Sequence, residues 1–353
     1  MVGARGRRVK RIQIPTENDW VSRTIEAMIE RPRRNRSSRA VRSLVQETTL
    51  RPANLVFPVF VEEGENVRRP IPSMPGVVRY SIDELVAEAK IASELGIAGL
   101  AIFPALADEL KDSTGTESLN PDGLLQRCVR ALKGEVPELL VITDVALDPY
   151  SSDGHDGVVR DGEIVNDETL PLLAKMAVAQ AEAGADVVAP SDMMDGRVYA
   201  IRTALDDAGF TNTAIASYCI KYASAFYGPF RDALDSSPKS GDKKTYQMDP
   251  HNVREALREI ALDEAEGADW IMVKPGLPYL DVVRLAREAT PLPIAAYHVS
   301  GEYAMLRAAA QNGWLDYDEC LLESLVCLRR AGADVIFTYG ALDAARLLAK
   351  STD

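Results

Sequence analysis

The chain has 353 residues, 46% of them hydrophobic and 26% charged, which is an ordinary globular composition and enough for a large core. Its formal net charge of -13, from 40 Lys and Arg against 53 Asp and Glu, argues against nucleic acid as the main partner. No apolar run approaches the roughly 20 residues of a membrane helix, so no membrane partner is expected. The four cysteines form no CxxC pair and fit a reducing compartment.

The first 42 residues differ from the remainder of the chain. They hold 12 Lys and Arg and only four acids, which leaves 28 basic and 49 acidic residues for the rest. We therefore predict an N-terminal arm over residues 1–42 that docks on an acidic body, its own or a neighbour's, and a catalytic domain over residues 43–353. A basic tail for an anionic surface and an organelle targeting peptide are the alternatives.

Eight apolar runs bounded by turn residues are predicted as strands. They lie at Leu55–Phe60, Gly99–Phe103, Leu139–Thr143, Asp186–Ala189, Ala214–Tyr218, Trp270–Val273, Pro293–Tyr297 and Asp334–Thr338. Helical patterns separate most of them, such as those at Ser81–Leu95, Thr169–Ala183, Val253–Glu266 and Leu321–Arg330. Strands that alternate with helices are typical of a parallel sheet.

Three of the predicted helices end on nearly the same sequence before the next strand. The sequence is Ala-Gly-Ala-Asp-Val at 183–187 and at 331–335, and Glu-Gly-Ala-Asp-Trp at 266–270. Glycine suits the left-handed cap that ends a helix. Eight strand–helix units predict an α/β fold, a (β/α)₈ TIM barrel with an extended N-terminal arm. A doubly wound open sheet is weakened as an alternative because no GxGxxG or Walker sequence follows the first strand.

The stretch Trp270-Ile-Met-Val-Lys-Pro-Gly276 is the clearest sign of chemistry. Lys274 lies where a buried strand leaves the core, and poor hydration there favours its neutral amine. A neutral lysine amine attacks ketones and forms Schiff bases. The alternative is a lysine whose stem packs on the core while its ammonium group reaches water.

A barrel of this kind places its active site at the C-terminal ends of its strands. In chain order these ends carry Asp144, Ser191, Asp192, Lys221, Lys274, Ser300 and Tyr339. If Lys221 and Lys274 face one basin, each disfavours charge on the other, which lowers the pKa of an amine and activates it. Two unrelated surface lysines are the alternative.

Basic residues also follow the fifth predicted strand. Arg231 lies beyond it, and Lys243 and Lys244 end a loop, Ser236–Lys244, that is rich in Ser, Gly, Lys and Asp. Basic groups on a mobile lid would suit a carboxylate substrate. A solvated loop without a role in binding is the alternative.

Four aspartates lie within the 14 residues from Asp144 to Gly157, after the third predicted strand. Clustered carboxylates suit a hard cation such as Mg²⁺. The same sequence is rich in Asp-Pro, Asp-Gly and Ser-Ser, which favour turns. Both interpretations stay open from the residues alone.

Together these motifs resemble the porphobilinogen synthase (5-aminolaevulinate dehydratase) family, from about Arg31 to the C-terminus. The resemblance rests on Arg31-Pro-Arg-Arg-Asn-Arg36, Ser191-Asp-Met-Met-Asp-Gly-Arg197, Lys221-Tyr-Ala-Ser-Ala-Phe-Tyr-Gly-Pro-Phe-Arg231, Met272-Val-Lys-Pro-Gly-Leu-Pro-Tyr-Leu-Asp281 and Val299-Ser-Gly-Glu-Tyr303. It implies a TIM-barrel lyase that condenses two 5-aminolaevulinate molecules to porphobilinogen with loss of two waters, in tetrapyrrole synthesis.

The resemblance also implies roles for individual residues. Lys274 would form the Schiff base with one substrate, and Lys221 would be the second active-site lysine. Arg231 and Lys243 match positions that hold one substrate's carboxylate, and Ser300 and Tyr339 match those that hold the other's. We add Asp144 and Asp192, at the strand ends, to the expected substrate-binding set.

Zinc-dependent members of the family have three cysteines where this chain has Ala146, Asp148 and Asp156. Without thiolates a tight catalytic zinc site is not expected. The resemblance implies instead Mg²⁺ or a monovalent cation, with Asp148 and Asp156 as active-site cation ligands and Glu259 as the ligand of an allosteric Mg²⁺. It further implies a homo-octamer assembled through N-terminal arms, in bacterial cytoplasm or plastid stroma.

Two rival functions follow from the residues. Another Schiff-base aldolase or dehydratase on the same barrel would share Lys274 without needing Lys221 or two carboxylate clamps. A non-catalytic barrel serving as a metal-dependent assembly protein would need neither lysine.

Overall fold

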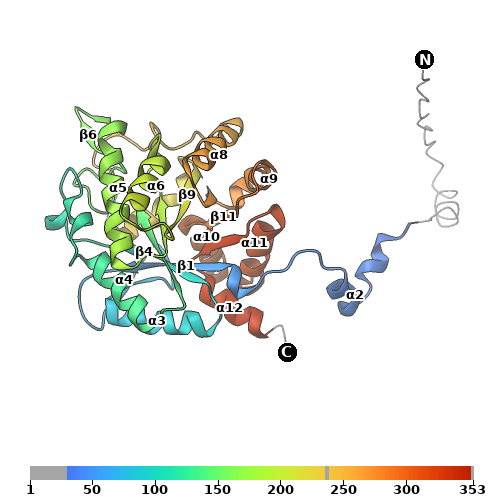
Figure 1. Ribbon diagram of the computed structural model, residues 1–353. Helices are drawn as coiled ribbons and strands as arrows, with labels where there is room; N and C mark the ends of the chain where they lie inside the picture. Colours follow the sequence, from blue (N-terminus) through green and yellow to red (C-terminus); the bar gives the residue numbers. More distant parts are fainter. Residues whose placement is uncertain (1–29, 235–237, 351–353) are drawn as a thin grey trace, which may run out of the picture. The chain divides into compact units, whose positions relative to one another are not determined.

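The computed structural model describes residues 30–234 and 238–350, and in it eight parallel strands close into a barrel ringed by helices (Figure 1). The strands are β1 (Leu55–Val61), β4 (Gly99–Pro104), β5 (Leu140–Val145), β8 (Val187–Pro190), β9 (Ala214–Lys221), β10 (Trp270–Lys274), β11 (Ile294–His298) and β12 (Val335–Thr338). Each pairs with the next in this order, and pairing of β12 with β1 closes the barrel. The predicted (β/α)₈ fold and all eight predicted strands are confirmed.

One helix or more follows each barrel strand and covers it from outside. The helices are α3 (Ile82–Glu94), α4 (Leu124–Glu135), α5 (Asn166–Ala183), α6 (Arg197–Asp207), α7 (Gly228–Leu234), α8 (Arg254–Glu266), α9 (Leu280–Ala289), α10 (Ser300–Gln311), α11 (Tyr317–Ala331) and α12 (Ala341–Lys350). The C-terminal ends of the strands therefore open towards the loops that precede these helices, where a barrel builds its active site.

Apolar side chains form two layers because successive strand residues point to opposite faces. The outer layer packs strands against helices and includes Val59, Ile271 and Val273. The inner layer fills the barrel and includes Phe60 and Met272. Barrel strands are buried on both faces, so they read in sequence as continuous apolar runs.

The repeated Gly-Ala-Asp sequences have a structural explanation. Their glycines Gly184, Gly267 and Gly332 end helices with φ of 108°, 102° and 129°, in the region that glycine adopts without strain. Their aspartates Asp186, Asp269 and Asp334 accept hydrogen bonds from the backbone N–H of Val141, Ile215 and Ile294, at 2.8, 2.7 and 3.1 Å. Each aspartate thus fixes the start of the neighbouring barrel strand, at the end of the barrel opposite the lysines.

Short elements outside the barrel were not predicted. β2 (Arg68–Pro70) and β3 (Val78–Tyr80) extend the sheet beyond β1, and β6 (Val159–Arg160) pairs with β7 (Glu163–Ile164) in a small hairpin. Strands of two or three residues are too short for a periodic pattern to reveal. Across the described residues, no helix has the length and apolarity needed to cross a membrane.

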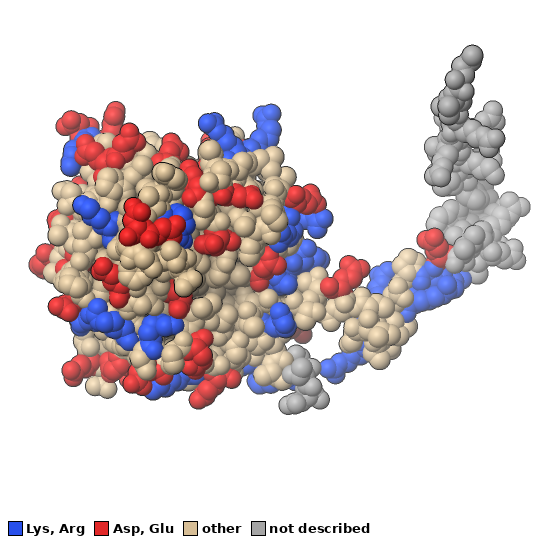
Figure 2. Space-filling view, viewed as in Figure 1, with Lys and Arg blue, Asp and Glu red and all other residues tan. Residues whose placement is uncertain are grey.

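The chain divides into two compact units, residues 1–47 and 48–353. The expected boundary at residue 42 falls inside α2 (Arg39–Leu44), a helix capped by the Ser38 hydroxyl, so the first unit extends further. Its described residues are nearly all exposed, Leu44 to 86%, and Figure 2 shows Lys and Arg atoms over them. The predicted arm residues 1–29 lie outside the described part.

Candidate active site

Two lysines lie side by side at the mouth of the barrel. In the ladder between β9 and β10, Lys221 is the direct partner of Lys274, so both are the last residues of adjacent parallel strands. Adjacent strands lie roughly 4.8 Å apart, which brings the two side chains into one basin. Both side chains are buried, with 6% and 7% exposure.

A β-bulge in β9 turns Lys221 into this basin. Between the partner pairs Ile271–Ser217 and Val273–Ile220, β9 contains one residue more than β10. Without it, strict alternation from Tyr218, which lies in the inner layer, would place Lys221 on the outer face. Bulges of this kind redirect side chains next to active sites.

Lys274 lies in an aromatic pocket. Four ring centroids surround its Nζ, those of Tyr297 at 4.8 Å, Tyr218 at 4.9 Å, Phe230 at 5.1 Å and Tyr227 at 5.2 Å. Burial, and secondly the charge of Lys221, lower the pKa of Lys274 to about 7. The ring faces also attract a cation, so the pocket suits a neutral amine before reaction and a positive iminium after it.

Ser300 and Tyr339 lie against this aromatic pocket. The Ser300 hydroxyl accepts a hydrogen bond from the backbone N–H of Phe230 at 3.1 Å. The Tyr339 hydroxyl is 3.2 Å from that of Tyr297. Each of these predicted substrate-binding residues therefore contacts a residue of the aromatic pocket around Lys274, and both are buried.

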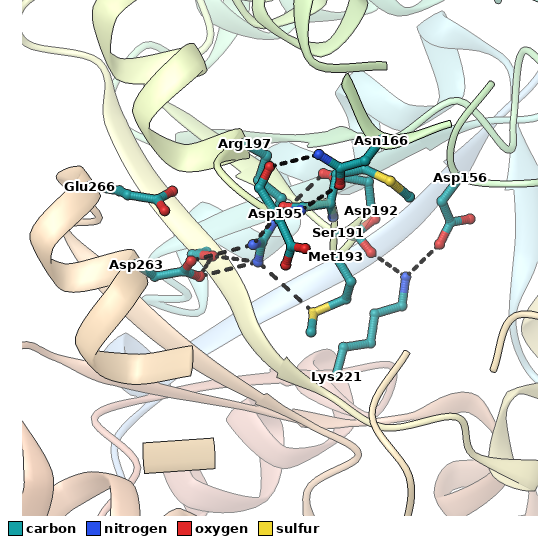
Figure 3. Close-up of polar contacts among 12 residues, drawn as sticks. Asp156, Asn166, Ser191, Asp192, Met193, Asp195, Arg197, Lys221, Asp263 and Glu266 are labelled. Atoms are coloured by element: carbon teal, nitrogen blue, oxygen red, sulfur yellow. Dashed lines mark hydrogen bonds and ion pairs between the residues drawn. The ribbon is translucent and has the colours of Figure 1, made fainter. Parts of the chain in front are cut away.

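Lys221 belongs to the acidic half of the site. Its Nζ lies 3.0 Å from Asp156 Oδ2 and donates a hydrogen bond to the carbonyl of Ser191 (Figure 3). Lys243 Nζ is 2.5 Å from Asp156 Oδ1 and 3.1 Å from Asp148 Oδ2. Burial alone would raise the pKa of Asp156, but Lys221 and Lys243 outweigh it and hold that pKa at about 2.

Asp144 carries the opposite shift at the end of β5. Burial, reinforced by the charge of Asp148, raises the pKa of Asp144 to about 7, although Lys221 and Lys274 act against the shift. A carboxyl group and an amine whose pKa values both lie near 7 can exchange protons with a bound substrate. Asp144 and Asp156 thus carry pKa shifts in opposite directions although they lie in one basin.

The predicted lid contributes Lys243 to the site, while Arg231 lies at the C-terminal part of α7. The Arg231 guanidinium is half-exposed and forms no hydrogen bond or ion pair with any described residue. The lid is fastened to the aspartate loop by His155, whose Nε2 donates to the Ser240 carbonyl at 2.8 Å and whose Nδ1 lies 3.1 Å from the Tyr246 hydroxyl. The lid residue Ser236 lies outside the described residues.

Asp192 pairs with Arg197 and, among the described contacts, with neither lysine of the basin. Its Oδ1 accepts from the Met194 N–H at 2.7 Å, and its Oδ2 lies 3.8 Å from Arg197 Nε (Figure 3). Arg197 pairs in turn with Asp263 of α8 at 3.1 Å. Burial raises the pKa of Asp192 to about 6, against the charge of Arg197. In this arrangement Asp192 belongs to a buried ion-pair network behind the site.

Glu259 lies on α8, on the wall of a cavity of about 890 Å³. The cavity is bounded by the β6–β7 hairpin, the lid and α8, and other acidic residues line it: Glu163, Asp195, Asp242, Asp249 and Glu255. Burial raises the pKa of Glu259 to about 7, which Arg197 opposes and Asp263 reinforces. Among the described residues, no group of three or more His, Cys, Asp and Glu side chains is arranged to hold a metal ion.

The sequence alone did not reveal the aromatic pocket around Lys274, the bulge in β9 or the contacts of His155. The aromatic residues of Lys221-Tyr-Ala-Ser-Ala-Phe-Tyr-Gly-Pro-Phe-Arg231 are visible there, but their direction depends on how the segment folds back over β10. His155 gave no signal because its partners lie 85 and 91 residues away.

Comparison with known proteins gives consistent results. The family described as delta-aminolevulinic acid dehydratase matches residues 29–347. The chloroplastic delta-aminolevulinic acid dehydratase of Selaginella martensii is 60% identical over 323 residues, which are 91% of this chain and 77% of that protein. The chloroplastic protein of Chlamydomonas reinhardtii is 56% identical over 339 residues, 92% of this chain and 86% of its own.

A solved structure extends the comparison to three dimensions. The delta-aminolevulinic acid dehydratase (porphobilinogen synthase) of Toxoplasma gondii, in complex with the reaction product porphobilinogen, superimposes with a TM-score of 0.89 at 57% identity. The match covers 91% of this chain and 92% of that one.

Proposed function

The chain belongs to the delta-aminolevulinic acid dehydratase family, and from that premise we propose how its barrel mouth works. It condenses two molecules of 5-aminolaevulinate to porphobilinogen with loss of two waters, as a hydro-lyase of tetrapyrrole synthesis. The observation that supports the lysine chemistry is the register pairing of Lys221 with Lys274. Family membership also removes the two rivals, another barrel aldolase and a non-catalytic assembly protein.

The neutral amine of Lys274 attacks the ketone of one substrate and expels water, which leaves an imine. Once protonated, the imine withdraws electrons and acidifies the neighbouring carbon, so that this carbon can form the carbon–carbon bond to the second ketone. Bond formation turns the second ketone into a hydroxyl group, and elimination of that hydroxyl releases the second water. The amino group of the second molecule then attacks the imine carbon, closes the ring and releases Lys274 as a free amine. The four rings around Lys274 attract the positive charge of the protonated imine and so stabilise it.

The two substrates would occupy the two halves of the basin. Ser300 and Tyr339 hold the carboxylate of the molecule on Lys274. The guanidinium of Arg231, which no described residue pairs with, holds the other. Lys243 is occupied by Asp148 and Asp156, so it must leave one of them to reach a carboxylate. Holding two copies of one small molecule in opposed orientations is largely a positioning task.

Mass spectrometry of the intact chain after borohydride reduction with 5-aminolaevulinate, followed by peptide mapping, tests the proposal. Borohydride reduces an imine to a stable amine, so a reacted lysine retains the substrate. We expect porphobilinogen in the untreated reaction and an adduct on Lys274. A second adduct on Lys221 would show that both substrates bind covalently, whereas no adduct on either lysine would overturn the Schiff-base mechanism.

The rate should depend on pH through Lys274. Its amine attacks only when neutral, and its pKa is about 7. Below pH 7 the neutral fraction falls tenfold per unit, so kcat/KM should rise with a slope near one from pH 5 to 7 and level off above. Initial rates over this range measure the profile, and a kcat/KM that continues to rise in the same way to pH 10 would show an ordinary lysine.

We propose that Glu259 binds Mg²⁺ at the acidic cavity. Mg²⁺ keeps several waters and needs only one or two carboxylates, which fits a half-buried Glu259 facing a cavity that can hold water. A bound cation would offset the charge crowding there. Asp148 and Asp156 fit a cation less well, because lysine ammonium groups already occupy their oxygens. We propose no zinc, since the aspartate loop carries no thiolate.

Adding Mg²⁺ should raise the activity severalfold. It should also raise the Tm by several degrees, because a ligand that binds the folded state stabilises it. Glu259→Gln should lose both responses, whereas Glu255→Gln, an exposed residue one turn earlier on α8 and on the same cavity, should keep them. A zinc chelator should leave activity largely unchanged. Strict zinc dependence would overturn the proposal.

We further propose a homo-octamer assembled through the arms, in the plastid stroma. The described part of the arm buries no residue in its helices, so it needs a surface on which to dock, and its arginines suit an acidic body. The plastid location is supported by relatives at 56–60% identity whose names describe them as chloroplastic.

A further inference from the structure

The motif Val299-Ser-Gly-Glu-Tyr303 contains a glutamate that the proposed reaction does not use. Glu302 lies in the first turn of α10 and is 1% exposed. Its carboxylate accepts three backbone hydrogen bonds, from Val299 N–H at 2.7 Å, Leu277 N–H at 2.7 Å and Gly276 N–H at 3.4 Å. Among the described residues, no cation forms an ion pair with it.

Only one of these hydrogen bonds is explained by helix capping. A glutamate at this position commonly accepts from the N–H of the residue before the helix, here Val299. The bonds from Gly276 and Leu277 come from the loop after β10, 26 and 25 residues earlier in the chain. One carboxylate thus joins the end of β10 to the start of α10.

Both joined segments lead directly to the active site. Gly276 is two residues beyond Lys274, and Ser300 is the residue after Val299. Ser300 bonds to Phe230 N–H, and the Phe230 ring is part of the pocket around Lys274. The loop after Lys274 and the residue expected to hold the substrate's carboxylate are therefore fixed to one side chain.

Close backbone packing allows these segments little freedom. A Cβ on Gly276 would lie 3.0 Å from the Tyr297 carbonyl oxygen, and a Cβ on Gly301 would lie 2.5 Å from that of Phe226. Only glycine permits both approaches. A small displacement of either segment would therefore move Lys274 relative to Ser300.

We propose that Glu302 is a positioning residue that fixes the distance between the imine-forming lysine, Lys274, and the carboxylate-binding Ser300. This inference rests on the proposed function of both residues. A substrate attached at its ketone and held at its carboxylate spans that distance, so Glu302 sets the geometry in which it reacts. Misplacement of about 1 Å can cost roughly 100-fold in rate.

Two substitutions separate positioning from capping. Glu302→Gln keeps the size but leaves one acceptor oxygen, so an NH₂ group must face a backbone N–H. Glu302→Asp keeps the carboxyl group and the capping of Val299 but is one methylene too short to reach Leu277 as well. Asp334→Asn is the matched control, since Asp334 accepts from Ile294 N–H at the opposite end of β11.

For all three variants we would measure the steady-state kinetics of porphobilinogen formation and the thermal unfolding. Borohydride trapping would give the rate at which the imine forms on Lys274. We expect kcat/KM to fall about 100-fold in Glu302→Gln and about 10-fold in Glu302→Asp, with KM raised and imine formation slowed in proportion. Asp334→Asn should lower the Tm and leave kcat/KM within about twofold of wild type.

The outcomes are distinct. Variants of Glu302 whose KM and imine rate match wild type, with kcat reduced only by the unfolded fraction, would overturn the positioning role and leave a helix cap. That result, with an active wild-type enzyme, would leave the proposed function intact. A wild-type chain that makes no porphobilinogen would overturn the proposed function and, with it, this inference.

Discussion

Replacing Lys274 by alanine is expected to abolish porphobilinogen formation while the barrel stays folded. Loss of a covalent nucleophile typically costs a factor of roughly 10⁴ or more, because the neighbouring groups act only together with it. Lys221 cannot substitute from its place, since it is held by Asp156 and the Ser191 carbonyl. Residual turnover near the wild-type rate would remove Lys274 from its role.

The same substitution should not lower the Tm. The pKa of Lys274 is lowered on folding, so its ammonium form is less favourable in the folded chain than in the unfolded one. Alanine removes that cost, and this gain offsets the packing that is lost with the side chain. Thermal unfolding and borohydride trapping of the variant check both expectations, and Lys90→Ala, which removes an exposed lysine on α3, serves as the control.

The barrel could be predicted because each strand carries its own signal. A strand such as β1 is buried along its whole length, so all of its residues are apolar and the run is visible without knowledge of its neighbours. The Gly-Ala-Asp sequences add a second local signal, since glycine ends the helix and aspartate begins the next unit. Local signals therefore located the strand ends and the two lysines.

The direction of Lys221 could not be predicted in the same way. Alternation along β9 from Tyr218 points it away from the basin, and only the ladder with β10 shows the extra residue that reverses it. The bulge has no sequence signature of its own. The prediction that both lysines share one basin therefore depended on their positions at strand ends. It did not depend on the direction of either side chain.

Partners across long stretches of chain were likewise invisible. Lys243 was assigned to a substrate carboxylate, and the structure pairs it with Asp148 and Asp156, 95 and 87 residues away. Those aspartates were assigned to a cation, and lysines occupy their oxygens. Each residue type was interpreted by the charge it could bind, but the fold brings these opposite charges together before any ligand arrives.

Asp156 is where this pairing has its largest predicted consequence. Asp156→Asn removes the carboxylate shared by Lys221 and Lys243 and leaves two buried ammonium groups without it, which should cost about 3–5 kcal/mol of unfolding free energy. It should also lower kcat by roughly 100-fold or more, because both lysines lose their orientation. Urea unfolding at pH 7 and steady-state kinetics measure the two effects.

The pH dependence of that loss distinguishes an ion pair from a packing effect. Lys221 and Lys243 hold the pKa of Asp156 at about 2, below the usual 3.8 of an unfolded aspartate, so its stabilisation is present above pH 4 and disappears as the pH falls towards 2. The stability difference between wild type and Asp156→Asn should therefore shrink by about 2 kcal/mol in acid. Asp153→Asn serves as the control, because Asp153 lies in the same loop and forms no ion pair with a described residue. A pH-independent difference for Asp156→Asn would mean that the carboxylate does not act as the lysines' counter-ion.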